Sequence, residues 1–330
     1  MQLLRKIGFP ISLIYAVVVY IRNILYDKGI FSSETFKTKT VCVGNLSTGG
    51  TGKTPMIEFL VAALKDDFKL AVLSRGYGRK SKGFLKAGIS TLVSELGDEP
   101  FQIHTKFPEI TVVVDEDRRN AISILEQGTR PDIVLLDDAY QHRKVTPRYA
   151  ILLTAFNKLY CDDWYLPTGD LRDGRRQAKR ADVIVVTKCP ENLDALAQEK
   201  IVRRLKINTN QQVLFSTLEY DTHVKGPGNT LSLGDLKTQN VTLVTGIADP
   251  TPLTSFLSQQ KINFEHLSFR DHHFFTENEI ALFNTKDLVL TTEKDFVRLK
   301  GKVSNLYYLG VKHRFLNDGK EVLLGAIKAL

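Results

Sequence analysis

The chain has 330 residues, of which 43% are hydrophobic and 25% are charged, and this balance excludes a disordered or fibrous protein. Its length is sufficient for two domains with well-buried cores, and its net charge of +8 favours acidic partners such as nucleic acid, anionic lipid or phosphorylated substrates. The three cysteines, Cys42, Cys161 and Cys189, lie far apart, which disfavours structural zinc and disulfides and is typical of a reducing compartment.

The first element along the chain is an apolar segment at residues 9–26, with Arg5 and Lys6 before it and Lys28 after it. Its unbroken apolar part ends at Tyr20, which is short of the roughly 20 apolar residues that a membrane-spanning helix needs. The residues that follow make a poor signal-peptide cleavage site. Two interpretations stay open on this segment alone: a buried first helix, or an interfacial helix that lies in a membrane surface.

The segment GNLSTGGTGKTP at residues 44–55 is similar to a phosphate-binding loop but departs from its usual pattern, G-x-x-x-x-G-K-[ST]. Ser47 stands where the first glycine belongs. The loop can still work, because its other glycines let consecutive backbone N–H groups surround phosphate oxygens at the start of a helix. Lys53 would reach the β/γ-phosphates, and the Thr54 hydroxyl would bind Mg²⁺. We therefore predict a nucleotide site formed by Thr48, Gly49, Gly50, Thr51, Gly52, Lys53 and Thr54.

Apolar strand-like runs follow this loop, with helical stretches between them. They occupy residues 41–45, 70–74, 111–115, 133–137, 149–154 and 183–187, and less regularly residues 213–220, 241–250, 287–295 and 306–310. Runs without polar alternation indicate strands that are buried on both faces, hence a parallel sheet. We predict a doubly wound, mostly parallel α/β fold of the P-loop NTPase type, with an apolar N-terminal helix and a second, smaller α/β domain.

The expected domain boundary lies after residue 152. Residues 1–152 would hold the N-terminal helix and the nucleotide-binding domain, and residues 153–330 the smaller domain that closes over the site. The final segment, GKEVLLGAIKAL, has an apolar helical face, so this last helix can pack back on the first domain.

Acidic residues follow one of the predicted strands and a further strand-like segment. Asp137 and Asp138 end the apolar run IVLLD, and neighbouring side chains at a strand end point in different directions, so the two can serve different tasks. Such acids hold Mg²⁺ or its water opposite a phosphate loop. Asp98 and Glu99, in the loop segment GDEP, are a weaker signal because most turn acids are simply solvated.

Two polar segments lie further along the chain. Residues 161–176 combine acids, a lone tryptophan and four arginines, which suit a transferring phosphate or an anionic substrate. The segment FRDHHFF at residues 269–275 lacks the spacing of a known metal site, so one histidine oriented by a distant carboxylate is the preferred interpretation.

These segments, in this order and spacing, resemble the tetraacyldisaccharide 4′-kinases of lipid A synthesis over nearly the whole chain. The resemblance rests on GNLSTGGTGKTP, SRGYGR, GDEP, DDAYQHR, LPTGDLRD, VTGIADP, FRDHHFF and TTEKD. It implies transfer of the ATP γ-phosphate to the 4′-hydroxyl of an acylated glucosamine disaccharide 1-phosphate, with Mg²⁺. The family's loop regularly lacks the first glycine. The chain departs from the family at Ala139, Tyr140 and the stretch Leu171–Gly174, which leaves the role of Asp173 open.

The resemblance also implies roles for single residues. Asp98 resembles the family's acid near Mg²⁺ and the attacking hydroxyl, and is the candidate base. Asp137 fits the acid on the Mg²⁺ side, so Thr54, Asp98 and Asp137 are the expected metal ligands. Asp138 with His272 matches the carboxylate–histidine pair, with His273 as the alternative partner. Arg172 matches the contact to the γ-phosphate.

A lipid substrate favours the interfacial interpretation of residues 9–26, because an enzyme whose substrate stays in a bilayer gains from an apolar helix with cationic flanks. We expect a peripheral protein on the cytoplasmic face of the bacterial inner membrane. No basic stripe with interleaved aromatic residues is present, so nucleic acid is not an expected partner.

The alternative function is that of a membrane-cycling P-loop ATPase with a regulatory role. Such ATPases carry a lysine before the glycine pair of the loop. Thr48 stands there in this chain, which counts against them.

Overall fold

A computed structural model describes residues 8–330, so Arg5 and Lys6 lie outside the described residues. The described residues form one 13-stranded sheet in which long apolar strands are buried in the middle. The strands of its first part, in spatial order, are β7 (Val183–Thr187), β6 (Tyr149–Ala155), β1 (Lys39–Asn45), β5 (Ile133–Asp137), β2 (Leu70–Ser74), β4 (Thr111–Val114) and β3 (Leu85–Lys86). All of these pairings are parallel except that of β3 with β4.

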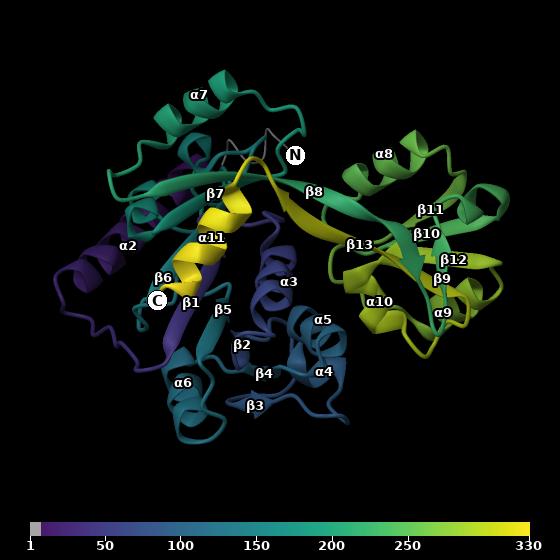
Figure 1. Ribbon diagram of the computed structural model, residues 1–330, viewed down its shortest axis with the longest axis horizontal. Helices are drawn as coiled ribbons and strands as arrows, with labels where there is room; N and C mark the ends of the chain where they lie inside the picture. The colour runs from purple at the N-terminus through teal and green to yellow at the C-terminus, as the bar shows by residue number, and fades with distance from the viewer. Residues whose placement is uncertain (1–7) are drawn as a thin grey trace.

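The second part of the sheet continues from β7 through two long strands. Its strands are β8 (Gln212–Lys225), β13 (Leu306–Phe315), β12 (Leu288–Thr292), β10 (Val241–Thr245) and β11 (Phe264–Ser268), and β9 (Thr230–Ser232) pairs with β8. The first residues of β8, Gln212–Phe215, pair in parallel with β7, and residues 216–225 pair antiparallel with β13. Strands β8 and β13 therefore connect the two parts, as Figure 1 shows.

Helices cover both faces of the sheet. They are α2 (Phe9–Asp27), α3 (Lys53–Leu64), α4 (Val93–Leu96), α5 (Asp98–Lys106), α6 (Arg118–Gln127), α7 (Ala195–Leu205), α8 (Thr251–Gln259), α9 (Glu277–Asn284), α10 (Glu293–Leu299) and α11 (Gly319–Lys328), with 3₁₀ turns η1 (Tyr160–Asp162), η2 (Arg175–Arg180) and η3 (Asp235–Thr238). The predicted doubly wound α/β fold is confirmed.

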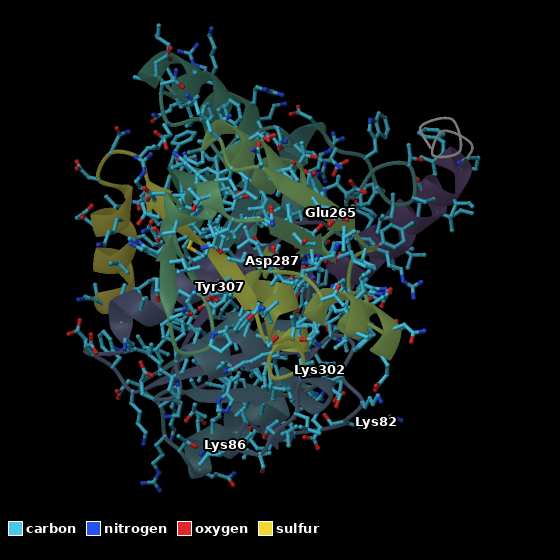
Figure 2. The ribbon with its side chains drawn as sticks, turned by 90° about the vertical axis from the view of Figure 1, so that its right-hand side faces the viewer. Lys82, Lys86, Glu265, Asp287, Lys302 and Tyr307 are labelled. Carbon is cyan, nitrogen blue, oxygen red and sulfur yellow. The ribbon has the colours of Figure 1, made fainter. Side chains whose placement is uncertain are left out.

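The two parts of the sheet have separate hydrophobic cores, which define two lobes. The first lobe comprises residues 8–215 and 315–330, and the second lobe residues 216–314. Figure 2 looks toward the second lobe and shows Glu265, Asp287 and Tyr307 there, with Lys82 and Lys86 of the first lobe below them.

The division near residue 216 differs from the expected boundary after residue 152. Strands β6 and β7 extend the parallel sheet beside β1, and their side chains, Ile151 and Val185 among them, join the core of the first lobe. The last helix, α11, also returns to this lobe, where Leu323 and Ile327 are fully buried in the same core. Strands and helices alternate along the chain in both lobes, so the sequence pattern does not show where the first lobe ends and the second begins.

Helix α2 packs with its polar side inward. Its buried positions are Ser12, Val19 and Asn23, and Tyr15 lies on the same stripe at helical spacing. The outward face is apolar and exposed, with Phe9, Ile11, Leu13, Ile14, Val17, Val18, Tyr20 and Ile21. By length and composition alone this helix could cross a membrane. A surface helix of a soluble protein turns its apolar face toward the core, whereas α2 turns its apolar face outward. This exposure argues against the buried-helix interpretation.

Candidate active site

The phosphate loop lies between β1 and α3, at the carboxyl edge of the parallel strands, where ligands of such folds bind. Gly49 and Gly52 have φ angles of 104° and 86°, which residues with a side chain rarely adopt. Thr48, Gly49 and Gly50 are exposed, so their backbone is open to a ligand.

The position of the missing glycine needs no glycine in this structure. Ser47 forms an antiparallel bridge with Leu171, so its backbone is extended and pairs with the segment that carries Arg172. The neighbouring Thr48 N–H donates to the carbonyl of Asp170 at 2.7 Å. The loop departs from the usual pattern because another segment of the chain holds its first residues.

Further contacts fix the rest of the loop from three strands. Asn45 at the end of β1 donates from Nδ2 to the Thr51 hydroxyl at 2.8 Å. Thr187 at the end of β7 donates from Oγ1 to the Thr51 carbonyl at 2.8 Å. His313 on β13 bonds the Gly52 carbonyl through Nε2 at 2.9 Å. The loop is therefore held in shape before any ligand binds.

Asp138 lies over the loop in a cationic setting. Both of its carboxylate oxygens accept from the Arg172 guanidinium, and Lys53 Nζ lies 3.9 Å from Oδ1. Burial raises the pKa of Asp138, but the positive charges of Lys53 and Arg172 outweigh burial. The pKa of Asp138 is therefore lowered overall, and the carboxylate is charged. Its φ of 47° is uncommon for a residue with a side chain and is a form of strain found at functional sites.

Asp137 ends β5 and is buried, with 4% of its surface exposed. Burial, Glu99 and Asp138 together raise the pKa of Asp137 to about 7. The positive charges of the protein near Asp137 therefore do not fully balance the negative charge of this carboxylate. Glu99, which the sequence marked only weakly, lies in the first turn of α5, close enough for its charge to raise the pKa of Asp137.

Asp98 and His272 form a pair that joins the two lobes. His272 Nδ1 lies 2.9 Å from Oδ2 of Asp98, and Arg298 of α10 donates from Nε to Oδ1 at 2.9 Å. Because a carboxylate only accepts, Nδ1 carries the proton, and Nε2 accepts from Lys294 Nζ at 3.0 Å. His272 has a φ of 58°, a second strained position at the site.

This arrangement corrects the predicted partner of His272. We expected Asp138, but Asp138 is engaged by Arg172 and Lys53, and His272 bonds Asp98 instead. His273, the alternative histidine, bonds Glu279 through Nε2 at 3.0 Å and stacks on Phe269 at 4.8 Å between ring centres. His272 has a left-handed backbone conformation and His273 does not, so the two side chains leave the chain in different directions. For this reason His272 contacts Asp98 and His273 does not.

The charge of Asp98 is stabilised strongly. Burial raises its pKa, but hydrogen bonds from Arg298 and His272 outweigh burial and hold the pKa of this carboxyl well below its usual range. Both carboxylate oxygens are already bonded, which disfavours the predicted role of Asp98 as a metal ligand. Asp98 is also the first residue of α5, where the sequence predicted a loop.

A cavity of about 370 Å³ opens beside this pair. Asp98 and His272 line it together with Tyr77, Gly97 and Phe274. The Tyr77 and His272 rings lie 5.5 Å apart, and Tyr77 and Phe274 are both 66% exposed. The cavity offers aromatic surfaces next to a charged pair, a combination that suits a sugar with apolar substituents.

Asp173, whose role the sequence left open, is fully buried. It accepts from Asn23 Nδ2 of α2 at 2.7 Å and from the Gly174 N–H at 2.8 Å, and Arg180 lies 3.8 Å away. Tyr15 of the same helix donates to the Arg172 carbonyl at 3.1 Å. Asp173 therefore anchors α2 to the segment that carries Arg172.

Sequence reasoning missed Asn45, Lys294 and Arg298. Lys294 lies within the motif TTEKD, and Arg298 lies three residues after it. The sequence analysis singled out this motif but did not predict which residues it contacts. Arg298 and Asp98 are 200 positions apart in the sequence, and a local sequence pattern cannot predict a contact between residues so far apart.

The family model described as tetraacyldisaccharide-1-P 4′-kinase matches residues 4–328. The tetraacyldisaccharide 4′-kinase of Flavobacterium johnsoniae is 46% identical, with 96% of this chain and 94% of the relative covered. That of Bacteroides thetaiotaomicron is 40% identical, with 90% and 83% covered.

Among solved structures, LpxK from Aquifex aeolicus in complex with ATP has a TM-score of 0.81 and 30% identity. The match covers 98% of this chain and 99% of that one.

Proposed function

Because this chain belongs to the tetraacyldisaccharide 4′-kinase family, we propose how its own residues carry out the transfer of the ATP γ-phosphate to the 4′-hydroxyl of the lipid disaccharide 1-phosphate. It is an ATP-dependent kinase of lipid A biosynthesis, and the alternative of a regulatory membrane-cycling ATPase is not favoured. The observation that carries the residue assignment is the Asp98–His272 pair, which lines the cavity.

The loop and its cations are proposed to hold the triphosphate. The exposed backbone of Thr48–Gly50, the N-terminal end of α3 and Lys53 would surround the phosphates. Arg172 presents a planar guanidinium that can bind phosphate oxygens in a bidentate manner. In the structure this guanidinium is paired with Asp138, which keeps it directed toward Lys53 until a phosphate binds.

The Asp98–His272 pair is proposed to take the proton of the acceptor hydroxyl. Asp98 alone would be a weak base, because Arg298 lowers its pKa. The neighbouring imidazole would share the proton-accepting role, because Asp98 accepts from Nδ1 and the lone pair lies on Nε2. Lys294 donates to Nε2 in the structure, so the acceptor hydroxyl would have to replace Lys294 at this nitrogen. A weak base suffices because the sugar hydroxyl becomes acidic only late in phosphoryl transfer.

The residues present fit a Mg²⁺ ion. Among the described residues no group of three His, Cys, Asp or Glu side chains gathers to hold a metal. Mg²⁺ in kinases needs only one or two carboxylates, because phosphate oxygens and water complete its shell. Asp137 and the Thr54 hydroxyl would hold it, with Glu99 nearby, and the raised pKa of Asp137 marks a place where positive charge is missing. When bound, Mg²⁺ would neutralise charge on the β- and γ-phosphates.

Helix α2 is proposed to lie in the cytoplasmic surface of the inner membrane. Its outward residues Ile14 and Val18 are 67% and 59% exposed, and Trp164 of the first lobe, 55% exposed, contacts Phe9 at 5.9 Å between ring centres. Tryptophan favours the boundary between lipid and water. The polar side of α2 contacts the segment of Arg172. The site would therefore face acceptor lipid at a fixed height above the bilayer.

The test is a kinase assay with labelled ATP and disaccharide 1-phosphate in detergent. The expected result is a labelled 1,4′-bisphosphate lipid, formed only when the acceptor is present. Steady hydrolysis of ATP without labelled lipid would contradict the proposed function and would support the regulatory ATPase instead.

A further inference from the structure

Lys188 is a half-buried cation that reaches the phosphate loop from the side opposite to the acids. It follows the last residue of β7, and its Nζ is the nearest atom to the position that a Cβ on Gly50 would occupy, at 3.8 Å. Within residues 8–330, Lys188 Nζ has neither a hydrogen bond nor an ion pair. The ammonium group therefore lies over the exposed part of the loop without a protein partner.

The backbone around Lys188 is fixed on both sides. Thr187, the residue before it, donates to the Thr51 carbonyl of the loop at 2.8 Å. Cys189, the residue after it, donates its N–H to the Ser216 carbonyl of β8 at 3.0 Å. Lys188 itself has a φ of 57°, a conformation that is unfavourable for lysine. The surrounding contacts maintain this strain, and the result is that the side chain is aimed at the loop.

The strand order shows which end of the nucleotide Lys188 can meet. Strand β5, with Asp137 and Asp138, lies on one side of β1, and β6 and then β7 lie on the other. The residues that face the transferred phosphate, Lys53 and Arg172, converge on Asp138. A nucleotide with its γ-phosphate near Asp138 therefore extends its α-phosphate and ribose toward β7.

The electrostatic setting of Lys188 agrees with this placement. Burial lowers the pKa of Lys188, and Asp249, in the loop after β10 of the second lobe, raises it in part. A lysine that is partly desolvated and lacks a bonded counter-ion gains from an anionic or oxygen-rich ligand.

We propose that Lys188 binds the α-phosphate and ribose oxygens of the adenine nucleotide. The proposal rests on the proposed function for the direction of the nucleotide. Because this end of the nucleotide does not change during the reaction, the contact stabilises the ground state and the transition state equally. Its loss should therefore weaken nucleotide binding and leave the chemical step nearly unchanged.

The test compares Lys188→Met with Lys206→Met. Lys206 is a matched control, since it is also a lysine with a left-handed φ, of 50°, but is exposed and lies after α7. Equilibrium binding of ATP, ADP and inorganic triphosphate is measured in the full chain, together with the thermal midpoint and the kinase rate. Lys188→Met should weaken ATP and ADP equally, by about 10-fold or more, and triphosphate by less, with Lys206→Met unchanged.

Three results would overturn the proposal. The first is that Lys188→Met binds ATP and ADP with wild-type affinity. The second is that the variant loses affinity for ATP but not for ADP, because this result would place the lysine at the γ-phosphate. The third is an unchanged nucleotide affinity with a raised KM for the lipid. Nucleotide binding is measured without turnover, so a wild-type protein that binds ATP but phosphorylates no lipid would contradict the proposed function alone.

Discussion

His313 Nε2 lies 2.9 Å from the carbonyl oxygen of Gly52, so β13, the strand that leads from the second lobe back to the first, is bonded directly to the phosphate loop. Since a carbonyl only accepts, Nε2 carries the proton, and Nδ1 accepts from the Ser216 hydroxyl at 3.0 Å. Burial lowers the pKa of His313 to about 4. The neutral imidazole ties the loop to β8 and β13, the two strands that connect the lobes.

The stability of the protein should therefore fall at mildly acidic pH. The folded pKa of His313, about 4, is below the unfolded value of 6.5, so the contribution is fully present above pH 6.5 and is lost as the pH falls toward 4. His313→Gln keeps a donor for Gly52 but does not titrate. Urea unfolding at pH 7.5 and pH 5 should show a loss that is larger in the wild type by about 1–3 kcal/mol. Equal losses in the two proteins would show that His313 does not remain neutral.

Asp98 and His272 should act as one unit. Asp98→Asn and His272→Ala should each lower kcat by about two to four orders of magnitude, with much smaller effects on ATP affinity. The double variant should be little worse than the more impaired single one, because either change disrupts the same pair. Steady-state kinetics and nucleotide binding provide the measurement.

The cycle of Asp138→Asn with His272→Ala is the control for this pair. Asp138 contacts Arg172 and Lys53 instead of His272, so the coupling energy should be smaller than that of the Asp98 cycle. A larger coupling to Asp138 would restore the partner that the sequence suggested.

Lys53→Ala should remove kinase activity and leave the fold intact. The ammonium group neutralises charge that grows on the phosphates during transfer, and the loop backbone alone does not replace it. Lys53 also lies 3.9 Å from Asp138, a partly exposed pair whose loss costs little stability. Lipid phosphorylation and the circular dichroism melting curve test both statements, and near-normal phosphorylation by the variant would rule out this role.

The two sides of α2 should respond differently to substitution. Ile14→Glu and Val18→Glu change outward, exposed residues, so they should reduce binding to anionic vesicles without lowering the melting temperature. Asn23→Ala removes the 2.7 Å bond to buried Asp173 and should destabilise the protein by about 1–3 kcal/mol. Vesicle sedimentation and thermal unfolding separate the two effects. Unchanged vesicle binding by the glutamate variants would contradict the membrane role of α2.

Local sequence determined the elements on which the site is built. Periodicity over a few residues marked the buried strands, and the strand, glycine-rich loop and helix around Lys53 followed from spacing alone. The apolar residues 9–26 marked α2, which occupies Phe9–Asp27. These features depend on backbone geometry and on neighbouring side chains, so a sequence window contains all the information they need.

The tertiary structure alone decided which distant residues meet. His272 lies 174 positions from Asp98 and Arg298 lies 200 positions from it, and their meeting depends on β8 and β13 placing the second lobe against α5. The sequence paired Asp138 with His272, with His273 as the alternative partner, and gave Asp98 a separate role. The left-handed backbone at Asp138 and His272 decides the pairing that forms, because it sets the direction in which each side chain leaves the chain, and only the packed fold can maintain that strain.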